Sequence, residues 1–341
     1  MDELAIQIYN VIKDYRNDDG IHISKDDIVE WASQFDGEAE FVLAELAHLI
    51  PQIYFSKERV RTCLRSNLNQ LYKLYKYTNV ETFLEDLSFI HMQGIDKSQT
   101  VLLDMIDDIV YQETGKHLDE YEHRQKSLFV YVDDVLASGG TIGRDIVNWL
   151  SEETRIADVC NGQMRLVVML LCVHSWGLGF QQYRIMKSFP SYDTRKIVWG
   201  WNYEIQNHLK LNAQSLNIAI PVNDQPIDVR NYLSTLSATK YEEYAYRDAC
   251  QPENETFFTS PENRIRYENI LLTKGIEIIK RMKSPGANVR PLGFINPNYK
   301  TYGLGTHFFT WRNIPNNSPL VFWWDIPEHG WKPLFPPKRK G

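Results

Sequence analysis

Two adjacent aspartates, Asp133 and Asp134, end an apolar run and are followed at once by a glycine-rich turn in the stretch "LFVYVDDVLASGGTIGRDIV" (128–147). Carboxylates can accept hydrogen bonds from hydroxyl groups or bind Mg²⁺. Glycines let the backbone come close to a ligand, and the free amide groups at a helix N-terminus attract anions. Together these features fit a phosphorylated ribose, which carries vicinal hydroxyls and a phosphate on one small molecule.

The elements around this stretch would place it at one edge of a parallel sheet. Three short apolar segments, rich in β-branched and aromatic residues, predict buried strands: 127–132, 165–173 and 196–201. Between the first two, Ile142, Ile146 and Trp149 recur at helical spacing, which predicts a β–turn–α–β unit. Because ligands of such sheets bind outside the carboxyl ends of the strands, the aspartates and the turn are the candidate site.

The rest of the chain suggests how the domains are organised. A length of 341 residues allows one large domain or two ordinary ones. Apolar residues recur at helical spacing up to about residue 76, so we predict a helical N-terminal region over 1–80. We predict an α/β domain over 81–341, whose C-terminal extension is dense in Gly, Pro and aromatic residues and should form short strands and ordered loops.

Composition and charge exclude several classes of protein. Hydrophobic residues make up 43% and charged residues 24%, which is typical of a globular chain. The longest purely apolar run, "LVVMLLCV" (166–173), is far shorter than the roughly 20 residues that span a bilayer, so we expect no membrane contact. An acidic N-terminus and four cysteines without short-range pairing predict a cytoplasmic location. The net charge of −7 argues against a protein that coats nucleic acid with its whole surface.

The stretch "VYVDDVLASGGT" (130–141) resembles the phosphoribosyl-pyrophosphate (PRPP) motif of type I phosphoribosyltransferases. That motif has a hydrophobic strand, two acidic residues, two aliphatic residues, a small residue, Thr or Ser, two Gly and Thr. The resemblance implies a parallel sheet flanked by helices, with PRPP or a related phosphoribosyl compound as ligand. It implies that Asp133 and Asp134 hold the ribose 2′ and 3′ hydroxyls for catalysis, and that they are candidate ligands of a Mg²⁺ cofactor. The loop around the 5′-phosphate would be Ala137, Ser138, Gly139, Gly140 and Thr141.

Phosphoribosyltransferases also have a pyrophosphate loop on an earlier strand. The stretch "HMQGIDKSQTVLLDMI" (91–106) offers Gly94, Lys97 and Ser98 ahead of a helix, and Lys97 could neutralise diphosphate charge. The alternative for Lys97 is an ordinary exposed lysine. The flexible loop that closes over the reaction would fall within 116–126, but its usual pattern is not visible there. The sequence therefore leaves two alternatives for this site: an enzyme, or a protein that binds the ligand without catalysing a reaction.

Other parts of the chain resemble the phosphoribosyltransferase-like effectors of bacterial conflict systems, including those encoded beside retrons. Three stretches carry this resemblance: "IVEWASQF" (28–35), "SPENRIRYENILLTKGIEII" (260–279) and the aromatic-rich ending after residue 290. It implies a toxin in antiphage defence that acts on a ribose-5-phosphate or nucleotide N-glycosidic bond. The alternative is a catalytically inactive sensor of a phosphoribosyl ligand, or a scaffold or regulatory protein.

A basic stripe, Lys57, Arg61 and Arg65, recurs at helical spacing ahead of several tyrosines and would suit nucleic acid. A retron effector would be held by a reverse transcriptase with its DNA–RNA product, so the resemblance implies that partner. The alternative for the stripe is an ordinary solvent-exposed helix face. The sequence also allows the protein to form a homo-oligomer. His174 lies just after the second predicted strand. It is either a catalytic acid or base, or a structural histidine whose ring nitrogens have hydrogen-bond partners at the end of the strand.

Overall fold

The chain divides into two compact units in a computed structural model that describes residues 1–94, 97–121, 125–152, 154–326, 328 and 330–338. The first unit combines Met1–Lys57 with Gln206–Gly341, and the second is Glu58–Ile205. This division differs from the predicted ranges 1–80 and 81–341. The basic helix after residue 57 groups with the sheet, and the C-terminal extension groups with the N-terminal helices. No described helix is long and apolar enough to cross a bilayer.

The second unit is a parallel α/β layer. Its strands form a four-stranded sheet in the order β2-β3-β4-β5, and every neighbouring pair is parallel. This confirms the predicted parallel sheet and the β–turn–α–β unit. Its elements, from the boundary onwards, are α4 (Lys57–Leu74), α5 (Val80–Asp86), β2 (Leu87–Ile90), α6 (Ser98–Thr114), η3 (Leu118–Tyr121), β3 (Leu128–Leu136), α7 (Gly140–Leu150), α8 (Arg155–Asn161), β4 (Arg165–His174), α9 (Ser175–Ser188), η4 (Thr194–Lys196) and β5 (Val198–Ile205).

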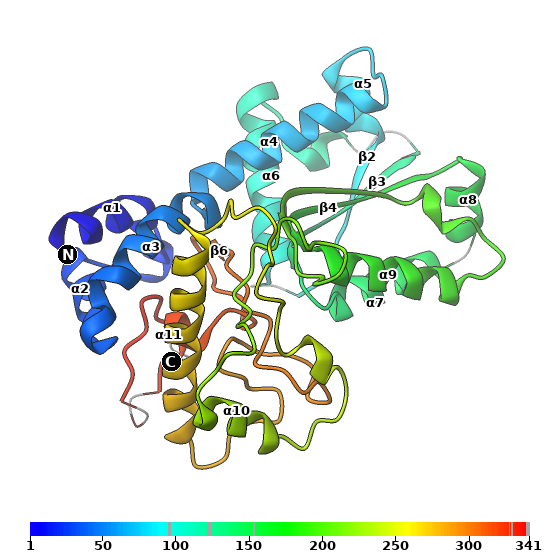
Figure 1. The fold of residues 1–341 in the computed structure, drawn as a ribbon. Coiled ribbons are helices and arrows are strands. Elements are labelled where there is room, and N and C mark those ends of the chain that lie inside the picture. The colour runs from blue at the N-terminus through cyan, green and yellow to red at the C-terminus, as the bar shows by residue number, and fades with distance from the viewer. Residues whose placement is uncertain (95–96, 122–124, 153, 327, 329, 339–341) are drawn as a thin grey trace. The chain divides into compact units, whose positions relative to one another are not determined.

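The core of the second unit forms where the sheet meets its helices. All but the first residue of β4 is buried, as its apolar run requires. The predicted apolar face of α7 is also buried, and Ile146 and Trp149 join Tyr131 of β3 and Leu166 of β4 in one cluster. Helices α7 and α9 pack on each other and run side by side in Figure 1. The carboxyl end of β3 is thereby fixed next to the first turns of both helices.

The first unit joins sequence from both ends of the chain. The strand pair β1–β6 is parallel, with Tyr54 opposite Phe309. Figure 1 shows the blue N-terminal helices beside the red C-terminal segment. Its elements are α1 (Asp2–Ile12), η1 (Asn17–Asp19), α2 (Lys25–Ser33), η2 (Asp36–Glu38), α3 (Ala39–Ile53), β1 (Tyr54–Phe55), α10 (Ile227–Ser234), η5 (Glu242–Tyr244), α11 (Pro261–Lys280), β6 (Phe309–Thr310) and α12 (Leu320–Trp323).

The aromatic-rich ending supplies the core of the first unit. The ring of Trp31 in α2 stacks on Phe322 of α12, with centroids 5.7 Å apart, and its Nε1 donates to the carbonyl oxygen of Val321 at 2.8 Å. The ring of Tyr15 meets Phe335 edge to face. Since each large ring needs apolar neighbours on several sides, the N-terminal helices and the C-terminal segment must fold together.

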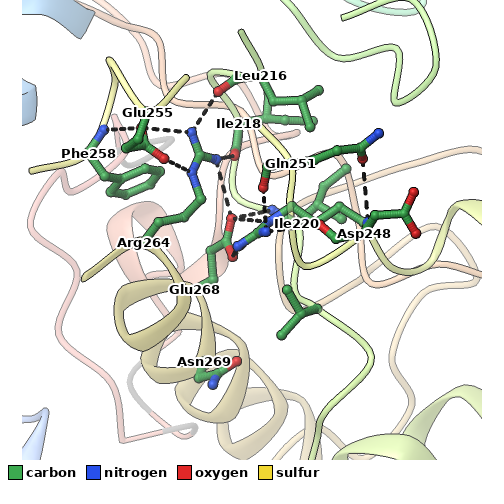
Figure 2. A network of polar contacts seen from close by, with 12 residues as sticks. Leu216, Ile218, Ile220, Asp248, Gln251, Glu255, Phe258, Arg264, Glu268 and Asn269 are labelled. Atoms are coloured by element: carbon green, nitrogen blue, oxygen red, sulfur yellow. Dashed lines mark hydrogen bonds and ion pairs between the residues drawn. The ribbon is translucent and has the colours of Figure 1, made fainter. Parts of the chain in front are cut away.

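A buried ion network connects α11 to neighbouring loops of the same unit (Figure 2). Arg247 and Arg264 both contact Glu268, with nitrogen–oxygen distances of 2.7 and 3.4 Å, and all three side chains are at most 1% exposed. Arg264 also pairs with Glu255 and donates to the carbonyl oxygen of Leu216 at 2.6 Å. Every charge in this network is therefore balanced and hydrogen-bonded, which is the condition under which burial of ions is tolerated.

Candidate functional site

The glycine-rich turn connects the carboxyl end of β3 to the first turn of α7. Gly139 precedes the helix with φ of 69°, a left-handed conformation that glycine adopts without strain. Ser138, Gly140 and Thr141 are exposed, whereas Gly139 is buried. The first amide groups of this helix of 11 residues have no intrahelical acceptor, so the exposed turn can bind an anion.

Gln181 of α9 supports the turn. Its side chain is fully buried, and its Nε2 donates to the carbonyl oxygen of Ser138 at 2.7 Å. A Cβ atom on Gly139 would lie 2.3 Å from Gln181 Cγ, and one on Gly143 would lie 1.8 Å from Gln181 Oε1. Both contacts are impossible for a real side chain. Glycine at these two positions therefore lets Gln181 reach the turn and hold it.

Asp133 is buried, and its carboxylate oxygens accept hydrogen bonds from two side chains that follow β2 in the chain. Gln93 Nε2 donates to its Oδ2 and Ser98 Oγ to its Oδ1, both at 2.7 Å. The backbone N–H of Asp134 donates to the same Oδ1 at 2.9 Å. Asp133 therefore connects Gln93 and Ser98 to β3, which is a second role beside the predicted contact with a sugar hydroxyl.

A chain of hydroxyl and carboxylate groups continues from Asp133 into the helix after the turn. The Tyr131 hydroxyl donates to Asp145 Oδ2 at 3.0 Å and lies 3.4 Å from Asp133 Oδ2. Burial raises the pKa of Asp145, although the bond from Tyr131 and the charge of Arg144 oppose that shift. Burial also raises the pKa of Tyr131 far above its ordinary value, so its hydroxyl stays neutral and fixes α7 to β3.

Asp134 is less enclosed than its neighbour. It is half-buried, and its Oδ1 accepts the backbone N–H of Val135 at 2.8 Å. The two carboxylates therefore differ: Asp133 is enclosed by protein groups, and Asp134 is partly open to solvent at the carboxyl end of the sheet. The predicted strand ends at residue 132, whereas β3 continues to Leu136, so both aspartates lie within the strand, close to the turn that follows it.

The predicted pyrophosphate loop is brought to this edge in part. Ser98 begins α6 and contacts Asp133. Gly94 and Lys97 are exposed, and the backbone N–H of Lys97 donates to the Gly94 carbonyl oxygen at 3.3 Å. The two residues between them lie outside the described part of the chain. A diphosphate contact of Lys97 stays a prediction.

The predicted closing loop is described only in part. His117 Nδ1 lies 2.7 Å from Asp107 Oδ2, and this hydrogen bond raises the pKa of His117. Lys126 Nζ donates to the carbonyl oxygen of Tyr121 at 2.8 Å. The residues 122–124 lie outside the described residues.

Sequence reasoning missed the residues that support the site, namely Gln93, Gln181 and Asp145. Two glycines in the segments that form α7 and α9 were the available signal, because glycine in a helix often marks a close backbone approach. Gly143 faces Gln181, and a Cβ atom on Gly177 would lie 1.9 Å from the carbonyl oxygen of Ala137. No comparable signal points to Gln93, whose role depends on the pairing of β2 with β3.

The basic stripe on α4 is paired with acidic side chains. The Nη2 atom of Arg61 lies 3.6 Å from a carboxylate oxygen of Asp108, and Nε of Arg65 lies 2.9 Å from one of Glu113. Lys57 Nζ lies 2.8 Å from Asp18 Oδ2 within the first unit. These contacts reduce the positive charge offered to a polyanion, and a nucleic-acid role for the stripe stays a prediction.

His174 is completely buried at the end of β4. Burial lowers its pKa to about 3, because the imidazolium form loses its hydration. An imidazole that is neutral throughout the physiological range does not exchange protons readily at pH 7. This complete burial favours the interpretation of His174 as a structural histidine at the end of a strand over that of a catalytic acid or base.

We expect burial of His174 to make folding sensitive to acid. Its folded pKa lies below the ordinary value of about 6.5, so below that pH the unfolded chain binds a proton that the folded chain rejects, and stability falls by up to about 1.4 kcal/mol per pH unit. His174→Gln should flatten this slope between about pH 7 and pH 5, measured by urea unfolding. The exposed His48→Gln is the control, and equal slopes for His174→Gln and the parent chain would contradict the expectation.

One of the comparisons with known proteins identifies a family. The chain belongs to the PRTase-CE family, whose family model matches residues 28–336. The match includes most of both units and confirms the predicted phosphoribosyltransferase-like fold. No curated protein and no solved structure matches the chain.

Proposed function

We propose that this chain is an enzyme that binds a 5-phosphoribosyl group and makes or breaks the N-glycosidic bond at ribose C1. One observation carries the proposal: a largely exposed, glycine-rich turn follows the carboxyl end of the parallel strand β3, whose last four residues include the carboxylates Asp133 and Asp134. The family match supports it, because it comes from phosphoribosyltransferase-like proteins.

The proposed catalysis depends on position and electrostatics. The turn Ala137–Thr141 would hold the 5′-phosphate, and Asp134 would accept hydrogen bonds from the ribose hydroxyls. Asp133 would share that contact if the sugar displaces Gln93 or Ser98. A sugar held at both ends exposes C1 to the incoming or departing group, so no nucleophilic side chain is required.

Mg²⁺ is part of the proposal as a companion of the diphosphate. Among the described residues no three His, Cys, Asp or Glu side chains gather into a metal site. Mg²⁺ commonly keeps several waters and substrate phosphates as ligands, with one or two carboxylates from the protein, and Asp134 fits that limited role. When bound, the ion would neutralise charge on the departing diphosphate.

The biological role that we propose is that of a toxin in bacterial antiphage defence, of the retron type, held in the cytoplasm by a reverse transcriptase with its DNA–RNA product. The family resemblance of the flanking sequence supports it. A second candidate function is a sensor or scaffold that binds a phosphoribosyl compound without chemistry. The observation that favours the sensor is the carboxylate of Asp133, which is already engaged by Gln93 and Ser98.

Calorimetry with PRPP and Mg²⁺ tests ligand binding, and mass spectrometry of nucleotide pools after expression tests turnover. Binding together with depleted or altered pools supports the enzyme. Binding with unchanged pools supports the sensor, and the absence of binding to PRPP and to ribose 5-phosphate would overturn both.

Asparagine variants of the two aspartates are expected to behave differently. Asp134→Asn should weaken PRPP binding with little change in melting temperature, because its carboxylate is partly open. Asp133→Asn should also destabilise the fold by about 1–3 kcal/mol, because a donor replaces an acceptor opposite Gln93 or Ser98. The double variant should lose turnover and toxicity while remaining folded by circular dichroism. A fully active double variant would refute the assignment of the site.

A further inference from the structure

One face of α9, together with the adjacent η4, gathers exposed aromatic and basic side chains. Four of them have the spacing i, i+3, i+4 and i+7, which places them on one face of the helix: Phe180, Tyr183, Arg184 and Lys187. Phe180 is 56% and Tyr183 53% exposed, values far above those of aromatic residues in the core. Large exposed apolar side chains grouped in this way mark an interaction surface.

The short helix η4 extends this surface. It packs against α9 and contributes two cations, Arg195 and Lys196, beside the exposed ring of Tyr192. Arg195 pairs with Asp193, with Nε 2.7 Å from a carboxylate oxygen. We call Phe180, Tyr183, Arg184, Lys187, Tyr192, Arg195 and Lys196 the α9 face.

The charge of the α9 face is opposite to that of the whole chain. Asp193 is the only acidic residue between 175 and 196, whereas the chain carries a net charge of −7. Among the described residues, the side chains of Arg184 and Lys196 have no ion pair, and the ammonium group of Lys187 lies 5.5 Å from the centre of the Tyr183 ring. The basic stripe on α4 differs, because Arg61 and Arg65 pair with acidic residues.

Cations interleaved with open aromatic rings match the chemistry of a single nucleic-acid strand. Its phosphates are attracted by Arg184, Lys187 and Lys196, and its unpaired bases can stack on Phe180 and Tyr183. A duplex would hide its bases from these rings. An acidic protein partner would match the cations, but it would need apolar side chains at the same spacing to cover the rings.

We propose that the α9 face binds single-stranded nucleic acid. The face belongs to the helix that supports the glycine-rich turn, since Gln181 is the neighbour of Phe180 and donates to the Ser138 carbonyl oxygen. The inference concerns binding alone and does not depend on the reaction proposed above.

Fluorescence anisotropy of labelled oligothymidine and of a mixed-sequence RNA, with the full chain at low salt, tests the proposal. Three unpaired cations predict that affinity falls about 20-fold when salt rises fourfold, because counterions are released from the strand. Arg184→Glu with Lys187→Glu should weaken binding about tenfold or more. Phe180→Ala with Tyr183→Ala should do the same at unchanged net charge, since each stacked base contributes about 1–3 kcal/mol.

The matched control is Lys280→Glu with Lys283→Glu, which changes net charge equally on exposed residues of the first unit. This variant should keep its affinity within about twofold of the parent chain. Absence of binding by the folded parent chain, or equal losses in the control and the α9 variants, would overturn the proposal. A parent chain that dimerises through the α9 face and binds no oligonucleotide would identify a second copy as its partner, which also overturns it.

Discussion

Gly177→Ala is expected to abolish phosphoribosyl binding and to destabilise the second unit by about 3 kcal/mol. Gly177 lies in the first turn of α9, and a Cβ atom there would lie 1.9 Å from the carbonyl oxygen of Ala137 and 3.0 Å from Leu136 Cδ2. The nearest atom belongs to the backbone of the proposed phosphate loop, so no side-chain rotation relieves the clash. Either α9 or the loop must move, and both outcomes disturb the turn that Gln181 holds.

Gly179→Ala is the matched control for this prediction. Gly179 lies in the same helix and has no heavy atom within 4 Å of the position of a Cβ atom. The added methyl group should stabilise the helix by about 0.5–1 kcal/mol through its better helix propensity. Thermal melting and calorimetry with PRPP measure both variants. If the Gly177→Ala protein had the melting temperature and affinity of the parent chain, α9 would not contact the loop as closely as described, and the prediction would be wrong.

Glu268→Gln is expected to destabilise the first unit by about 3–5 kcal/mol. The substitution keeps the volume of the side chain but removes its charge, which leaves Arg247 buried without its carboxylate partner. Arg264 keeps its pair with Glu255, so Arg247 bears most of the loss. Burial raises the pKa of Glu268 while the two arginines lower it, so the carboxylate depends on both guanidinium groups for its charge.

Denaturant unfolding followed by tryptophan fluorescence measures this effect. Glu38→Gln is the control, because it removes an exposed pair with Arg266 that should contribute less than about 1 kcal/mol. Similar losses in the two variants would mean that water reaches the network around Glu268, in conflict with its complete burial.

The sequence alone predicted the candidate site because the residues of that site are close together in the chain. "VDDVLASGGT" places carboxylates, glycines and the start of a helix within ten residues, and each follows from residue type and spacing. The apolar run 166–173 and the spacing of Ile142, Ile146 and Trp149 likewise predicted a parallel unit, which the pairing of β3 with β4 confirms.

The partners of these residues could not be read in the same way. Gln93 precedes Asp133 by 40 positions, and Gln181 follows Ser138 by 43, so their contacts depend on strand pairing and helix packing. The residues that join the two ends of the chain in the first unit are even farther apart in the sequence, because Tyr54 of β1 pairs with Phe309 of β6. Periodicity reports which face of an element is buried, but it does not report what covers that face.

The sequence by itself determined that this protein has a parallel α/β sheet with a glycine-rich turn beside two carboxylates, and it predicted that this turn binds an anion. Only the tertiary structure decided how the two carboxylates differ, which glutamine holds the turn, and that Arg61 and Arg65 form ion pairs whereas Arg184 and Lys196, among the described residues, form none. The physical reason is that composition and spacing act along the chain. The burial of Asp133, the contact of Gln181 with Ser138 and the ion pairs of Arg61 and Arg65 arise between segments that only folding brings together.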